Sequence, residues 1–294
     1  MDAFSIGIVG TLSSSLFWAM AVILFRKSSD HVTGFGVNVG KNAVGIVFFT
    51  LTLLVMGTPL APDMTTRDFQ LLILSGVIGI GLGDLLFMSS LKMLGAGLNA
   101  IVGCIYTPLM IIAGVVIFSE TVGVQLIVGG VLVVCAIIIA SSGDMHNRPR
   151  HLALGMFLAV ISMLSTLVGA ILYKDLLDRY DLFYITWFRL IAGCAFLIVY
   201  YFVHPRRRAL LTGLGNLHNW KSLVLAGFLG TYLAISGWAL GLRNLPASLI
   251  AVLSELTVIM IILMAYFFLR ESLTPRKMVA TALAVGGAFL SIMT

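Results

Sequence analysis

The chain has 294 residues, of which 60% are hydrophobic and only 10% are charged. Soluble domains carry about 25% charged residues, so this composition excludes a soluble globular protein. The net charge of +6 does not indicate a nucleic-acid partner, because the dense basic cluster Arg206–Arg208 lies between two apolar runs and is typical of a membrane-surface anchor.

Apolar runs recur along the whole chain, and each is long enough to cross a hydrocarbon core of about 30 Å. They are too long and too unbroken for the alternating strands of a barrel. We place ten spans, at residues 4–25, 34–57, 69–91, 97–118, 122–142, 153–173, 183–203, 221–242, 247–269 and 275–293. The sequence therefore predicts an all-α integral membrane protein with ten transmembrane helices.

An internal repeat organises these spans. The segment from Leu91 to Ala100 recurs 151 residues later, from Leu242 to Ala251. The same offset relates Gly76 to Gly227, Gly79 to Gly230 and Glu120 to Glu271. We expect two units, residues 1–145 and 150–294, with five spans each. Because five is odd, the second unit enters the membrane from the opposite side, which predicts inverted repeats with a substrate site near the midplane between them.

Four ionisable residues fall well inside the spans: Lys41, Asp84, Arg189 and Glu255. Each costs a few kcal/mol there unless it is paired or faces water, so each is a candidate for substrate or ion binding. Their depths place Lys41 level with Asp84, and Arg189 level with Glu255 toward the opposite face. We predict two charge clusters flanking a central cavity, which alternating access makes and breaks in turn. Static ion pairs that hold helices together are the alternative interpretation.

Four aromatic residues, Trp18, Tyr106, Tyr232 and Trp238, lie deep in their spans. We expect them to line the cavity; an interfacial aromatic belt is the alternative. Pro108 lies in the middle of span four, where it should kink the helix and free a carbonyl for the cavity.

No enzyme, cofactor or metal site is predicted. The three cysteines lie in apolar runs without a CxxC spacing. The His146 and His151 pair could bind a metal, but solvated loop histidines are favoured. The sequence contains no HExxH, GxSxG or Walker-type motif.

Three motifs resemble the EamA-type transporters of the drug/metabolite transporter superfamily: Ile105-Tyr106-Thr107-Pro108 leading to Phe118-Ser119-Glu120, Trp187-Phe188-Arg189, and Phe268-Leu269-Arg270-Glu271-Ser272-Leu273. In that family a glutamate precedes the last span of each unit, and Glu120 and Glu271 match it as structural motif residues. Two departures are Ile259, which stands where the second unit would repeat Pro108, and Lys41, which replaces the usual arginine.

The resemblance implies gradient-driven export of small metabolites, commonly amino acids. A cavity that offers both Lys/Arg and Asp/Glu complements a zwitterion, which favours amino acids as the substrate class. A broad drug or lipid-headgroup carrier and a non-transport membrane subunit are the alternatives. Proton exchange through Glu255 or Asp84 would provide the coupling.

The expected location is a cell membrane, most simply the inner membrane of a prokaryote. The expected partners are the lipid bilayer and a small-molecule substrate, with a homodimer as a further possibility. Twelve Lys and Arg residues fall in the odd-numbered connections and four in the even-numbered ones, which favours termini outside the cell. The family is generally drawn with cytoplasmic termini, so the orientation stays open.

Overall fold

The computed structural model describes residues 2–59, 63–118, 124–141 and 151–290, and these residues form helices and connections without a strand. The first half contains α1 (Ala3–Ser28), α2 (Gly34–Met56), α3 (Thr66–Ser75), the π-helix η1 (Gly76–Gly83), α4 (Asp84–Leu94), α5 (Ala96–Gly103), α6 (Tyr106–Phe118) and α7 (Val124–Ser141). The second half contains α8 (Leu152–Arg179), α9 (Leu182–Val203), α10 (Arg207–Leu210), α11 (Leu217–Ala226), the π-helix η3 (Gly227–Ala234), α12 (Ile235–Asn244), α13 (Ala247–Leu269) and α14 (Pro275–Leu290).

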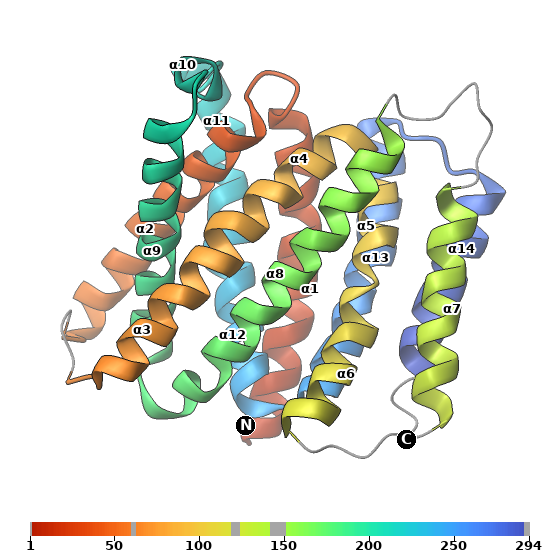
Figure 1. Ribbon diagram of the computed structural model, residues 1–294, viewed down its shortest axis with the longest axis horizontal. Helices are drawn as coiled ribbons and strands as arrows, with labels where there is room; N and C mark the ends of the chain where they lie inside the picture. The colour runs from red at the N-terminus through yellow and green to blue at the C-terminus, as the bar shows by residue number, and fades with distance from the viewer. Residues whose placement is uncertain (1, 60–62, 119–123, 142–150, 291–294) are drawn as a thin grey trace.

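Eight helical stretches are long and apolar enough to cross a membrane. Three of them join several elements: α3–η1–α4, α5–α6 and α11–η3–α12. The other two predicted spans correspond to α7, with 18 residues, and α14, with 16 described residues. These two helices pack side by side at one edge of the bundle (Figure 1). Ten crossings therefore remain a prediction, while the multi-pass helical architecture is established.

Large apolar side chains cover the outer surface of the bundle. Val55 is 88% exposed, Val203 78% and Phe267 71%. Apolar patches of this extent are rare on soluble proteins, whereas lipid tails solvate them without cost. The helices satisfy their own backbone hydrogen bonds, as a hydrocarbon environment requires.

The two π-helices lie at equivalent positions of the two halves. Both η1 and η3 are eight residues long, and they start at Gly76 and Gly227, the pair that the sequence repeat relates. In each half the irregular helix packs against the first two helices of the other half: η1 against α8 and α9, and η3 against α1 and α2. Figure 1 also shows that α1 and its counterpart α8 run in opposite directions.

Glycines bring η1 into backbone contact with the second half. A Cβ atom added to Gly169 of α8 would lie 2.9 Å from the Cα of Gly79, and one added to Gly76 would lie 2.4 Å from the carbonyl oxygen of Arg189. Contacts this close exclude any side chain. Asp84 directly follows η1 in the chain. The glycines of η1 therefore determine how close Arg189 and Asp84 lie to each other.

Glu271 caps a helix of the opposite half. Its Oε1 accepts a hydrogen bond from the Ala96 N–H at 2.7 Å, and its Oε2 accepts one from the Gly97 N–H at 3.1 Å. Gly95, which precedes α5, offers no side chain for this role and has a φ of +78°. The acidic side chain thus satisfies two of the free N–H groups at a helix N-terminus and interacts favourably with its dipole. Its repeat counterpart, Glu120, lies outside the described residues.

The Gly169–Gly79 contact predicts the effect of a single methyl group. Gly169→Ala should lower the free energy of unfolding by about 1–3 kcal/mol, because the added carbon overlaps the η1 backbone. The midpoint of thermal unfolding of the detergent-solubilised protein measures this change. Gly286→Ala is the matched control, since nothing lies within 4 Å of a Cβ at that position. Equal stability of the two variants would contradict the contact.

The Glu271 cap predicts a graded loss of stability. Glu271→Ala removes both acceptors and should lower the free energy of unfolding by about 1–2 kcal/mol. Glu271→Gln keeps one acceptor oxygen and should cost less. Amide hydrogen exchange at Ala96 and Gly97 checks the local effect, and unchanged protection in Glu271→Ala would show that the cap contributes nothing.

Candidate functional site

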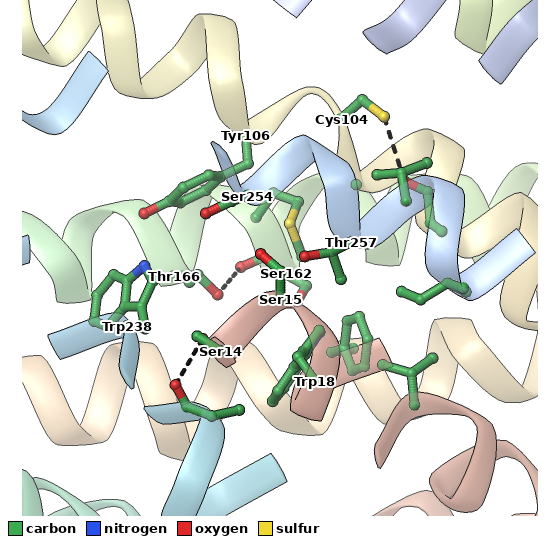
Figure 2. A pocket seen from close by; sticks show the side chains of 18 of the residues that line it. Ser14, Ser15, Trp18, Cys104, Tyr106, Ser162, Thr166, Trp238, Ser254 and Thr257 are labelled. Atoms are coloured by element: carbon green, nitrogen blue, oxygen red, sulfur yellow. Dashed lines mark hydrogen bonds between the residues drawn. The ribbon is translucent and has the colours of Figure 1, made fainter. Parts of the chain in front are cut away.

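A cavity of about 270 Å³ lies within the bundle, and both halves form its walls. Six of the eight side chains predicted to contact substrate or ion line it: Trp18, Asp84, Tyr106, Arg189, Trp238 and Glu255. In Figure 2 the rings of Tyr106 and Trp238 lie on one side of the cavity, and the hydroxyl groups of Ser15 and Thr166 lie near its centre.

Lys41 and Asp84 form a buried ion pair. The Lys41 side chain is fully buried in α2, and its Nζ lies 2.6 Å from Oδ2 of Asp84 at the start of α4. Lys41 also donates a hydrogen bond of 2.8 Å to Oδ1 of Asn42. Lys41 is not among the lining residues, so it reaches the cavity only through Asp84. The predicted proximity of the two charges is therefore confirmed, while their role in transport stays a prediction.

The second predicted cluster, Arg189 with Glu255, is wrong. Neither residue takes part in an ion pair among the described side chains. Glu255 of α13 accepts a short hydrogen bond from the Thr107 hydroxyl of α6. Arg189 of α9 instead lies against η1 and over the ring of Tyr173, with its guanidinium carbon 3.9 Å from the ring centroid. Counting residues along a span predicts only the height of a side chain in the bundle. Which neighbour it contacts depends on the direction in which the side chain points around the helix axis.

Three buried polar atoms on the cavity wall have no hydrogen-bond partner among the described residues. They are the Tyr106 hydroxyl, Nε of Arg189 and Oε2 of Glu255. Buried polar groups in folded proteins are nearly always paired, so these atoms are candidates for contact with a ligand or a bound water. One cavity thus presents a cation, an anion and a hydroxyl group, each with free hydrogen-bonding capacity.

Pro108 interrupts span four. Helix α5 ends at Gly103 and α6 begins at Tyr106, as expected for a proline that lacks the N–H of a regular helical turn. The expectation of a carbonyl left free for the cavity is wrong. The carbonyl of Cys104, four residues before the proline, accepts a hydrogen bond of 3.2 Å from the Thr107 N–H. The interruption instead places Tyr106 and Thr107 on the cavity wall.

Tyr232 does not line this cavity. Its hydroxyl group pairs with the Thr52 hydroxyl at 2.7 Å, and its ring lies in a separate groove with Phe48 and Met56. Tyr232 is part of η3, and a π-helix changes the direction of the side chains that an α-helical count predicts. The neighbouring Ala234 and Ile235 line the central cavity in its place.

Sequence reasoning missed the hydroxyl groups of the wall. Besides Thr107 of α6, serine and threonine residues from three further helices line the cavity: Ser14, Ser15, Ser162, Thr166, Ser254 and Thr257. The spacing of Ser162 and Thr166, and of Ser254 and Thr257, places each pair on one helix face, which was a usable signal. Tyr173 was also missed as the partner of Arg189.

The fold and the cavity define a multi-pass helical membrane protein in which two related halves enclose a largely apolar pocket with a few charged and polar side chains. The model of the EamA-like transporter family matches the chain twice, over residues 5–142 and 153–293. The chain therefore belongs to the EamA-like transporter family, in agreement with its resemblance to the EamA-type transporters of the drug/metabolite transporter superfamily.

Relatives of known sequence agree with this assignment. An uncharacterized transporter of Archaeoglobus fulgidus is 24% identical over 186 residues, which are 63% of this chain and 64% of the relative. An uncharacterized transporter of Clostridium kluyveri is 22% identical over 139 residues, which are 47% of this chain and 45% of the relative. The chain thus spans less than two thirds of the length of these relatives.

A solved crystal structure has the same fold. It is 15% identical in sequence and superimposes with a TM-score of 0.73, covering 99% of this chain and 96% of its own. At this identity the likeness establishes the fold and not the substrate.

The Lys41–Asp84 pair predicts how stability responds when one charge is removed. Lys41→Met leaves the Asp84 carboxylate without its cation and should lower the free energy of unfolding by about 3 kcal/mol, the lower end for buried pairs, since Asp84 is partly exposed. The double variant Lys41→Met/Asp84→Asn should recover most of this loss, because no charge is left uncompensated. Thermal unfolding in detergent measures both, and equal stability of the single and double variants would argue against the pair.

Proposed function

We propose that this protein is a secondary active transporter that exports small metabolites, with amino acids as the substrate class. The observation that carries this proposal is that Arg189 and Glu255 line one cavity, and each keeps a polar atom without a partner among the described residues. The carboxylate of a zwitterion would accept hydrogen bonds from Arg189, while its ammonium group would donate to Glu255. Hydrogen bonds between charged groups are about twice as strong as hydrogen bonds between neutral groups.

The charge balance of the wall favours a zwitterion over a singly charged ligand. Lys41 and Asp84 neutralise each other, so Arg189 and Glu255 are the charges left for a ligand among the described lining residues. A purely anionic ligand would leave the negative charge of Glu255 without a partner. A purely cationic ligand would leave the positive charge of Arg189 without a partner. An uncompensated charge away from water is costly. A cavity of about 270 Å³ also suits a molecule of amino-acid size.

Alternating access between two inverted five-helix repeats, residues 1–145 and 150–294, is the proposed mechanism. Three features support it: η1 and η3 obey the repeat offset, α1 and α8 run in opposite directions, and each π-helix packs on the other half. Inverted repeats provide two equivalent arrangements around one fixed site. The substrate would bind near the midplane, where Trp238 and Glu255 meet the cavity.

Proton exchange through Glu255 would provide the driving force. Glu255 is buried, lines the cavity and has one oxygen, Oε2, without a partner among the described residues. Its carboxylate could hold either a proton or the substrate ammonium group, but not both. Competition of two cations for one carboxylate is sufficient to couple their movements. In this scheme an entering proton displaces the amino acid outward across the cell membrane of a prokaryote.

Counterflow in proteoliposomes tests the proposal. Purified protein is preloaded with one unlabelled amino acid at a time, and entry of the labelled form is followed with and without a pH gradient. We expect uptake of at least one amino acid, and a fall of at least about 10-fold in Glu255→Gln and in Arg189→Gln, because each loses a charged hydrogen bond to the substrate. Arg26→Gln is the control, since Arg26 pairs with Asp30 on the surface.

Three results would count against the proposal. If the folded protein showed no counterflow for any amino acid, a drug or lipid-headgroup carrier would become the favoured function. Full activity of Glu255→Gln would remove the proposed ammonium site. If the rate of counterflow were the same with and without a pH gradient, the proton would be excluded as the coupling ion.

A further inference from the structure

Arg189 and Lys41 are stabilised in different ways. Lys41 is bound to a carboxylate and an amide oxygen, so two of its three N–H donors are occupied. Arg189 is 5% exposed, and no ion pair includes it among the described residues. The guanidinium group of Arg189 lies over the ring of Tyr173, with its carbon 3.9 Å from the ring centroid. A cation this deep in a protein needs compensation, and here an aromatic ring contributes to it.

The Tyr173 ring is held by the helix that carries Arg189. Its hydroxyl group forms a short hydrogen bond with the Thr186 hydroxyl of α9. Thr186 donates its own proton to the Leu182 carbonyl at 2.7 Å, so Tyr173 is the donor in the bond between the two hydroxyl groups. Thr186 precedes Arg189 by three residues and lies on the same face of α9. One helix face therefore fixes both the ring and the guanidinium group above it.

Tyr173 also supports the aromatic wall of the cavity. Its ring is parallel to that of Trp238, with an interplanar angle of 6° and centroids 6.3 Å apart. Trp238 and Arg189 both line the cavity, whereas Tyr173 is fully buried behind them. Its side chain thus contacts two lining residues from α9 and α12 without touching the cavity itself.

We propose that Tyr173 is a positioning residue that keeps Arg189 charged at the cavity wall while leaving its Nε–H free for a ligand carboxylate. This rests on the proposed function of Arg189. A carboxylate partner from the protein would occupy the fork of donors and compete with the ligand. The face of an aromatic ring attracts the cation through its quadrupole and requires no hydrogen-bond donor from it.

The test changes the electron density of the ring without changing its shape. Phenylalanine and phenylalanines with an increasing number of fluorine atoms are incorporated at position 173, since fluorine withdraws the charge that attracts a cation. Binding of each of the twenty L-amino acids and of its methyl ester is measured by titration calorimetry on the intact protein in detergent. The ester lacks the carboxylate, so the ratio of the two affinities reports the contribution of Arg189.

Tyr173→Phe should change this ratio by less than about 3-fold, because the ring is retained. The ratio should fall stepwise with fluorination, to a total of about 10-fold for the fully fluorinated ring. The same residues at position 48 are the control, because Phe48 lies in the aromatic cluster with Phe228 and Tyr232 and outside the central cavity. No change is expected there.

Two results would overturn the inference. A ratio that is insensitive to fluorination at position 173, or an equal fall for acid and ester, would make Tyr173 a packing residue only. Failure of the proposed function itself looks different: Arg189→Gln with an unaltered Tyr173 would then bind acid and ester in the wild-type ratio. Since fluorination preserves shape, the variants fold if Tyr173→Phe does, and its thermal unfolding is measured first.

Discussion

A charge buried away from water must be compensated, and this constraint governs the interior of the protein. Lys41 and Asp84 meet it by pairing with each other at 2.6 Å. Arg189 meets it with an aromatic ring, and Glu255 with the hydroxyl group of Thr107. The first solution consumes both charges, whereas the other two leave polar atoms open to the cavity. In the proposed function this difference distinguishes the Lys41–Asp84 pair from Arg189 and Glu255, which would bind the ligand.

Glycine contacts determine where those charges lie. Gly76 and Gly79 bring η1 against α9 and α8, so the backbone of Arg189 touches the segment that leads directly into Asp84. A larger residue at Gly76 would have to displace the Arg189 backbone, because a Cβ there would lie 2.4 Å from the carbonyl oxygen of Arg189. The glycine contacts of η1 therefore also determine the distance between the charges of Arg189 and Asp84 at the cavity wall.

Much of this was readable from the sequence, and the failures have physical reasons. The repeat offset anticipated the matching positions of η1 and η3, and depth counting placed Lys41 beside Asp84, because consecutive antiparallel helices leave little choice of neighbour. The same count failed for Arg189 and Glu255, since depth carries no information about direction around the helix axis. Tyr232 was misplaced because the π-helix alters that direction locally.

The break before Pro108 makes the two halves mechanically unequal. Helices α5 and α6 are separated at Cys104 and Ile105, whereas their counterpart α13 runs unbroken from Ala247 to Leu269. The cavity wall thus combines an interrupted helix, α5–α6, with a continuous helix, α13, that packs against it. In the proposed cycle the outward and inward arrangements then differ in elastic energy, although the repeat would otherwise make them equal. A preference of the resting protein for one side of the membrane would follow from this difference in the proposed cycle.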